Sequence, residues 1–300
     1  MIKRTLYFGN PAYLKAKDEQ MVVEYPGGNA ESKSIPIEDI GVVILDSPQI
    51  TITHVLLNKL LANNAAIITT DDRHMPSGLL YPIESNTLQS ERFTAQLSAS
   101  VPLKKQLWQQ TVQAKIQNQA FLLKTIGIDI EPMRYWARSV RSGDPDNYEG
   151  RAAAYYWKNL FMGYTNDIFI RGRNGDEPNN LLNYGYAILR AVVARSLVAS
   201  GLLPTLGIHH HNRYNAFCLA DDLMEPYRPF VDRIVLEIVK AGIDYTELTK
   251  EIKAKLLVIP AIDVVIDGMS SPLMIATQRT TASLYDCFEG ASRKILYPSF

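Results

Sequence analysis

The sequence predicts an α+β protein in which a small β-rich domain over residues 1–86 precedes a larger all-α domain over residues 87–300. Short runs rich in Val and Ile, separated by turn residues, fill the first part of the chain and are typical of strands. From Thr87 onward, apolar residues recur at helical spacing instead. A chain of 300 residues is also long enough for two domains with separate cores.

In the β-rich part we expect a hairpin, further buried strands and one helix. The hairpin joins Leu14–Lys17 to Met21–Tyr25 across a short polar turn. The helix is predicted over His54–Asn63, because Thr53 can cap its first turn. Its apolar face would consist of Val55, Leu56, Leu60 and Leu61. The remaining strands are expected at Gly41–Leu45, Ala65–Thr69 and Gly78–Ile83.

The C-terminal part is predicted to consist of helices. Aromatic residues on their apolar stripes, such as Trp108, are expected to belong to the core. The predicted helical segments are Leu103–Ile126, Gly150–Phe161, Asn179–Gly201, Asp221–Val239, Tyr245–Leu257 and Leu273–Leu284.

Composition narrows the class of protein. Hydrophobic residues make up 47% and charged residues 21%, which is typical of a globular chain and not of a disordered one. Cys218 and Cys287 are too few for a disulfide framework, and no closely spaced cysteine pair suggests zinc. The sequence shows neither a signal peptide nor an apolar run long enough to cross a bilayer, so we expect a cytoplasmic protein.

Charge gives no general sign of nucleic-acid binding. Lys and Arg number 31, as do Asp and Glu, so the formal net charge is zero. Basic residues outnumber acidic ones between residues 132 and 195, but for any single arginine a solvated helix surface is the better interpretation.

Three places along the chain hold residues suited to chemistry. The first is Glu149, which follows a turn-prone stretch and would lie in the first turn of a helix. An acid there can simply complement the helix dipole, and taken alone that explanation is favoured. The second is His209–His211, where a metal-binding role and an incidental polar loop are about equally plausible, and His210 would face opposite to its neighbours in an extended chain.

The third place is the acidic segment Asp221–Glu225. On a helix, Asp222 and Glu225 share a face, and so do Asp221 and Glu225. Like charges so placed repel one another, which a bound cation would relieve. The alternative is a helix start, where acidic residues are favourable.

Together these residues predict a site for a hard divalent cation. Carboxylates with one imidazole and no cysteine suit Mg or Mn better than a closed zinc site. Mg binds through a few carboxylates and substrate phosphates, so the expected chemistry is phosphoryl transfer. The chain shows no convincing phosphate loop or serine elbow, and Cys218 lies in an apolar run that indicates packing.

The three places, in this order, resemble the motifs of the CRISPR-associated Cas one integrase and endonuclease family. The matching segments are Asn147–Ala153, Gly207–His210 and Ala220–Pro229, and His210 and Glu225 are fifteen positions apart. The resemblance covers nearly the whole chain and is greatest to the form found in type II systems. It is this resemblance that selects His210 over His209 and His211.

The resemblance implies that Glu149, His210 and Glu225 are the catalytic metal ligands, with Asp222 assisting. The helical domain would be catalytic, and the β-rich domain would mediate homodimerisation. Dimers would flank a Cas two dimer on double-stranded DNA. The site would then join protospacer 3′-hydroxyl ends to the repeat array by transesterification. Charge and neighbourhood suggest the phosphate contacts Arg151, Arg171, Arg173, Arg190 and Arg213.

Three other functions remain open from the sequence. A stand-alone nuclease for branched DNA would use the same residues. A non-catalytic DNA-bridging scaffold would bind DNA regardless of substitutions at Glu149 or His210. A transition-metal protein built on His209–His211 would bind zinc or nickel tightly without DNA.

Overall fold

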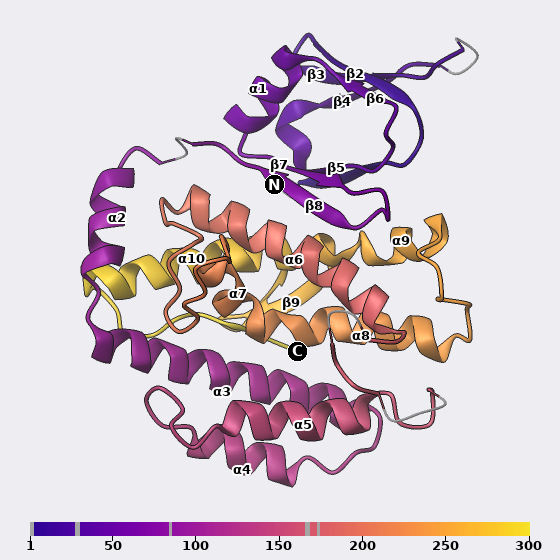
Figure 1. Ribbon diagram of the computed structural model, residues 1–300. Coiled ribbons are helices and arrows are strands. Elements are labelled where there is room, and N and C mark those ends of the chain that lie inside the picture. The colour runs from indigo at the N-terminus through magenta and orange to yellow at the C-terminus, as the bar shows by residue number, and fades with distance from the viewer. Residues whose placement is uncertain (1–2, 28–30, 84–85, 166–168, 173–174) are drawn as a thin grey trace. The chain divides into compact units, whose positions relative to one another are not determined.

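The computed structural model describes residues 3–27, 31–83, 86–165, 169–172 and 175–300. The chain forms two compact units, Met1–Thr87 and Leu88–Phe300 (Figure 1). Strands dominate the first unit and helices the second, so the predicted mixture of N-terminal strands and C-terminal helices is confirmed.

The described residues of the N-terminal unit form two four-stranded sheets. One has the order β1-β5-β7-β8, with β1, β5 and β7 parallel and β8 antiparallel; the other has the order β4-β3-β2-β6, with only β2 and β6 parallel. The strands are β1 Arg4–Phe8, β2 Ala12–Lys17, β3 Gln20–Glu24, β4 Lys33–Pro36, β5 Ile40–Leu45, β6 Ile50–Ile52, β7 Ala66–Thr70 and β8 Pro76–Leu80, with the short helix η1 Ile37–Asp39 and the helix α1 His54–Ala62 between them.

Local signals explain two of these elements. Asp18 and Glu19 have positive φ angles of 49° and 56°, the geometry of a two-residue hairpin turn, so the predicted hairpin is confirmed. Thr53 caps α1 by accepting a hydrogen bond from the backbone N–H of Leu56 at 3.4 Å, as predicted. Val55 was wrongly placed on the apolar face, because its side chain is exposed.

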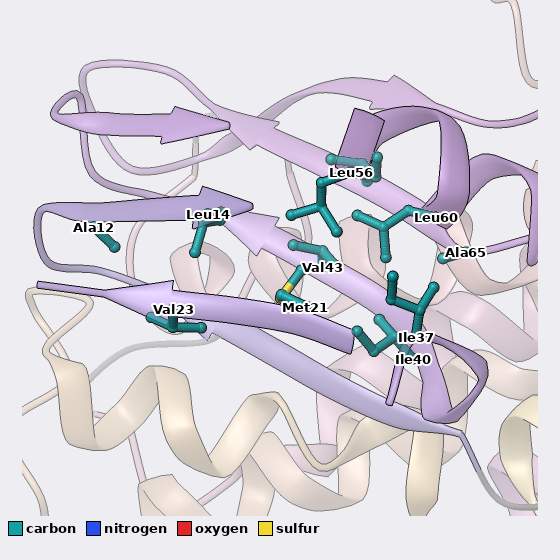
Figure 2. Close-up of a cluster of buried hydrophobic side chains, with 11 residues drawn as sticks. Ala12, Leu14, Met21, Val23, Ile37, Ile40, Val43, Leu56, Leu60 and Ala65 are labelled. Carbon is teal, nitrogen blue, oxygen red and sulfur yellow. The ribbon is translucent and has the colours of Figure 1, made fainter. Parts of the chain in front are cut away.

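The core of this unit draws on both sheets and on α1 (Figure 2). Leu14 and Met21 come from one sheet and Val43 from the other, while Leu56 and Leu60 reach them from the helix. Their burial removes apolar surface from water, and each such side chain contributes about 1.5–3 kcal/mol.

The C-terminal unit is built mainly of helices. Its α-helices are α2 Gln89–Ser98, α3 Val101–Thr125, α4 Glu131–Ser139, α5 Tyr148–Leu160, α6 Asn179–Ala199, α7 Cys218–Met224, α8 Arg228–Lys240, α9 Lys250–Leu256 and α10 Leu273–Glu289, and its short 3-10 helices are η2 Glu225–Tyr227 and η3 Ile259–Ala261. The long helix α3 packs against α4 and α5 on one side and against η2 and α8 on another (Figure 1). It therefore brings together segments that are far apart in the sequence.

The prediction that this unit is all-α is wrong. Strands β9 Asp263–Ile266, β10 Met269–Pro272 and β11 Pro298–Ser299 form a small antiparallel sheet in the order β10-β9-β11. Asp267 and Gly268 have positive φ angles and turn β9 into β10. Val264 and Ile266 are buried in alternation, so this short run has the period of a strand. In the part of the chain that the structure describes, no helix is long and apolar enough to cross a membrane.

Candidate active site

Glu149 is held at the start of α5 by a well-capped first turn. Asn147 adopts a left-handed conformation, with a φ of 53°, and its side chain accepts a hydrogen bond from the N–H of Gly150 at 3.1 Å. Asp144 accepts hydrogen bonds from the backbone N–H groups of Tyr148 and Glu149, both at 2.9 Å. Since neighbouring side chains satisfy these helix donors, the Glu149 carboxylate is not needed as a cap. It turns to α3 instead.

A buried lysine on α3 joins two of the predicted site residues. The Nζ atom of Lys115 lies 2.6 Å from Oε1 of Glu149 and 2.6 Å from Oε2 of Glu225. The other oxygen of Glu225 lies 3.1 Å from Nη2 of Arg228. Glu225 begins η2 and is almost fully buried, so the two cations compensate a charge that burial would otherwise penalise.

The pKa values in this cluster move in the directions expected of charged partners. Burial lowers the pKa of Lys115, but Glu225 and Glu149 raise it by more, and it ends above its ordinary value. Burial raises the pKa of Glu225, but Arg228 and Lys115 together lower it further. Both groups are therefore charged at neutral pH.

His210 is fixed by Asp222. Its Nδ1 lies 2.5 Å from Oδ1 of Asp222, whose side chain is fully buried. The same carboxylate accepts the backbone N–H of His209 at 2.9 Å and, more weakly, that of His210 at 3.3 Å. The hydrogen bond that its ring donates to Asp222 raises the pKa of His210 against the effect of burial, and the charges of Asp222, Glu225 and Glu149 add to this increase.

The neighbouring histidines differ in their surroundings. His209 stacks on Trp108, with the ring centroids 4.1 Å apart and the planes nearly parallel, and burial lowers its pKa. Trp108 also meets His210 edge-on at 5.5 Å. His211 is exposed. The tryptophan that was predicted as a core residue is indeed buried, and it also supports the histidine segment.

Gly207 allows this segment to lie close to α7. A Cβ atom at this position would lie 2.4 Å from the carbonyl oxygen of His210 and 2.8 Å from Oδ2 of Asp222. Real Cβ atoms do not approach other atoms so closely. Glycine is therefore required by close packing at the point where the carboxylate meets the histidine segment.

The donor set fits a divalent cation, although the side chains as they stand do not form a cage. Within the described ranges, no three His, Cys, Asp or Glu side chains lie close enough to hold a metal together. However, Oε2 of Glu225 is buried and accepts no hydrogen bond of good geometry from the described residues, despite its ionic contact with Lys115. Two carboxylates that share one buried cation form a set of oxygen donors that suits a hard metal ion.

Asp221 and two of the predicted phosphate contacts have structural partners. Arg190 donates from Nε to Oδ1 of Asp221 at 2.6 Å, and Asn215 donates to the other oxygen of Asp221 at 2.7 Å. Arg171 donates to the side chains of Asn179 and Asn183 at 2.8 and 2.9 Å. Arg171 thus ties the segment before α6 to residues at the start of that helix.

Two of the remaining predicted phosphate contacts lie on the surface. Arg151 and Arg213 are exposed, and their guanidinium groups lie over the rings of Tyr148 and Tyr214. Arg173 lies outside the described residues.

Sequence reasoning missed Lys115 and gave no role to Arg228. Lys115 falls among apolar positions of α3, between Val112 and Ile116, and a lysine on a helix face that is otherwise buried was the available signal. Arg228 lay within the matched motif, but its partner Glu225 is apparent only in the folded chain.

The fold and the site define a class: a chain with N-terminal strands and a helical unit in which two glutamates share a buried lysine and an aspartate orients a histidine, groups typical of enzymes that act on phosphodiesters. The family model described as CRISPR associated protein Cas1 matches residues 6–258. The chain is 40% identical, over 259 residues, to the CRISPR-associated endonuclease Cas1 of Neisseria meningitidis serogroup C, covering 86% of this chain and 83% of that protein. The chain therefore belongs to the Cas1 family.

Solved structures share the fold over nearly the full length. A casposase bound to integration product has a TM-score of 0.79 at 19% identity, covering 98% of this chain and 92% of that one. A chain of a Cas6-RT-Cas1–Cas2 complex has a TM-score of 0.74 at 17% identity, covering 97% of this chain and 35% of that one. The predicted family is thus confirmed, and so is the grouping of this chain with the CRISPR-associated endonucleases.

Proposed function

We propose that this chain is a metal-dependent DNA integrase and endonuclease of CRISPR adaptation, which joins the 3′-hydroxyl ends of a protospacer to the repeat array. The observation that carries this proposal is the convergence of Glu149 and Glu225 on a single cation, together with the orientation of the His210 imidazole by Asp222, which precedes Glu225 by three residues. Membership in the Cas1 family supports the same conclusion.

In this proposal Glu149, His210 and Glu225 hold a Mg or Mn ion. The bound ion supplies Lewis-acid polarisation of the phosphate and lowers the pKa of the attacking hydroxyl. Asp222 accepts a hydrogen bond from Nδ1–H of His210 and so keeps the proton on that nitrogen, which leaves the lone pair of Nε2 for the metal. Arg228 keeps Glu225 ionised, so that it can act as a ligand.

The reaction is a transesterification. A protospacer 3′-oxygen forms a bond to a phosphorus atom at the repeat boundary, and the bond from that phosphorus to the repeat's own 3′-oxygen breaks. The attacking hydroxyl loses its proton and the leaving oxygen gains one, so the number of phosphodiester bonds is unchanged and no ATP is needed. Water in place of the 3′-hydroxyl would give a nick.

Double-stranded DNA and Cas2 are the proposed partners. The DNA would contact exposed guanidinium groups such as those of Arg151 and Arg213, while Arg190 would reach phosphate from its pair with Asp221. The N-terminal unit would mediate homodimerisation, and two dimers would flank a Cas2 dimer. Because the net charge is zero, we expect the isolated chain to bind DNA weakly and with strong dependence on salt.

The test is a strand-transfer assay with the Cas2 partner, a short labelled duplex bearing 3′-hydroxyls, and a supercoiled plasmid carrying a repeat array. We expect joining of the label in Mg or Mn, and its loss in EDTA, in Glu149→Ala and in His210→Ala. Glu149-dependent cutting of branched DNA without joining would favour a repair nuclease. DNA binding without either reaction, unchanged in both variants, would favour a scaffold and overturn the catalytic proposal.

A further inference from the structure

Lys115 occupies the place between the two glutamates that a metal would need. Its Nζ is 2.6 Å from one oxygen of each carboxylate, Oε1 of Glu149 and Oε2 of Glu225. Magnesium binds carboxylate oxygens at about 2.0–2.1 Å, so a divalent ion that took these two oxygens as ligands would need them free of the ammonium. The lysine side chain is only 10% exposed, which makes it part of the interior of the site and not a passing surface contact.

The ammonium and a divalent ion exclude one another. They would compete for the same two oxygens, and a single and a double positive charge this close repel strongly where water is scarce. The site can therefore hold one cation or the other between Glu149 and Glu225.

The surroundings favour departure of the lysine over movement of the glutamates. Arg228 still binds the other oxygen of Glu225, 3.1 Å away, when the ammonium leaves. Oε2 of Glu225 loses its contact with the ammonium and is then open to another cation. Glu149 is anchored through the capped first turn of α5. Lysine carries its charge on a flexible stem and can swing away.

We infer that Lys115 is a built-in competitor of the catalytic metal: it neutralises Glu149 and Glu225 in the metal-free protein and must be displaced before a divalent ion binds. This inference rests on the proposed metal site. It assigns Lys115 as a positioning residue that keeps two carboxylates together without metal and weakens the affinity of the free chain for metal.

The inference predicts a gain of function in binding. We expect Lys115→Met, which keeps the length of the stem but removes the charge, to bind Mn²⁺ on the order of tenfold or more tightly than the wild type. Lys115→Arg keeps the charge and should not show this gain. Lys124→Met, on an exposed position of the same helix, is the matched control and should bind as the wild type does.

The measurement is titration of free Mn²⁺ by electron paramagnetic resonance, using the full-length protein without DNA. In EDTA, Lys115→Met should melt at a lower temperature than the wild type, because its two carboxylates repel one another, and saturating Mn²⁺ should close that gap. If the role of Lys115 were purely structural, the Lys115→Met substitution would weaken Mn²⁺ binding as well as stability. If Lys115→Met is not folded in EDTA, Lys115→Gln retains a hydrogen-bond donor without the charge and carries the same expectation.

Equal or weaker Mn²⁺ binding in both Lys115→Met and Lys115→Gln would overturn the inference, and so would an equal gain in Lys115→Arg. Adding Glu149→Ala to Lys115→Met must abolish the gain. If the wild type does not catalyse strand transfer but Lys115→Met still binds Mn²⁺ more tightly, the proposed integrase function is rejected and the competition between Lys115 and the metal is not. If the wild type catalyses strand transfer but Lys115→Met does not bind Mn²⁺ more tightly, only the role of Lys115 is rejected.

Discussion

Replacing Asp222 with asparagine tests whether the orientation of His210 matters to the site. The carboxylate accepts from the ring Nδ1 at 2.5 Å and from the N–H of His209 at 2.9 Å. If the amide oxygen of the introduced asparagine keeps the backbone bond, its NH₂ group faces Nδ1 and moves the ring proton to Nε2. If the amide flips, two donors face each other at the backbone instead. The first arrangement loses the weak bond from the N–H of His210, and the second loses the bond from the N–H of His209, each a loss of about 1–3 kcal/mol.

The effect on metal binding should exceed the effect on folding. A protonated Nε2 has no lone pair for a metal, and removing such an orienting partner typically lowers metal affinity about 10–100-fold. We therefore expect Asp222→Asn to bind Mn²⁺ that much more weakly and to lose strand transfer in proportion, while remaining folded.

The same substitution should change the dependence of stability on pH. Asp222 raises the pKa of His210 above its ordinary value of 6.5. A group whose pKa is raised by folding stabilises the protein fully below its unfolded value, and that contribution is lost as pH rises through the folded value. In EDTA, the advantage of the wild type over Asp222→Asn should thus be largest below pH 6.5 and should shrink above it.

Histidine NMR titration, urea unfolding between about pH 5 and 8 and Mn²⁺ binding measure these three effects. Asp221→Asn is the matched control, since Asp221 pairs with Arg190 and Asn215 and makes no hydrogen bond to His210 among the described residues. We expect the control to keep its metal affinity and to lose no more than about 1 kcal/mol, as is usual for a partly exposed ion pair. Unchanged Mn²⁺ affinity in Asp222→Asn, with a lowered pKa of His210, would refute the reasoning.

Three other substitutions test neighbouring contacts. Gly207→Ala should destabilise the protein by about 1–3 kcal/mol in urea unfolding, because the added methyl group collides with Asp222 and the His210 carbonyl; wild-type stability would contradict this. Arg151→Ala should leave unfolding unchanged but reduce the salt dependence of DNA affinity by about one unit of slope, and an identical slope would exclude Arg151 from the DNA contact. Burial raises the pKa of Asp232 from 3.8 to about 6. The protonated side chain therefore contributes fully to stability below pH 3.8, and this contribution is lost as pH rises through about 6. The wild type should lose about 3 kcal/mol relative to Asp232→Asn over this range, and parallel pH profiles would disprove it.

The parts of the fold that could be predicted depend on local signals. The hairpin at Asp18 and Glu19 and the cap at Thr53 need only neighbouring residues, and the structure confirms both. In the sheet of β9, β10 and β11, the Asp267-Gly268 turn of the β9–β10 hairpin was a local signal that was overlooked, whereas the pairing of β9 with β11 joins segments about 30 residues apart. Such a short strand shows little of its pattern before its partner is known.

The candidate site shows the same division between local and long-range information. The motifs named Glu149, His210 and Glu225 as donors, but they could not say that Lys115 lies between two of them. A buried lysine is stable only beside its counter-ions, and those lie on other helices. For the same reason, Arg171 looked like a phosphate contact until Asn179 and Asn183 were seen to occupy its guanidinium group.

The spacing of the two C-terminal motifs has a physical explanation in these contacts. Gly207 has no side chain, so the segment that follows it can approach Asp222 closely enough for the carboxylate to hold both the backbone of His209 and the ring of His210. Glu225 follows Asp222 by three residues, about one helical turn, and it faces Lys115. A single turn of chain therefore fixes an imidazole with one acid and presents a second acid to the cation. If either motif were shifted by one residue, Asp222 could not hold the histidine segment while Glu225 contacts Lys115.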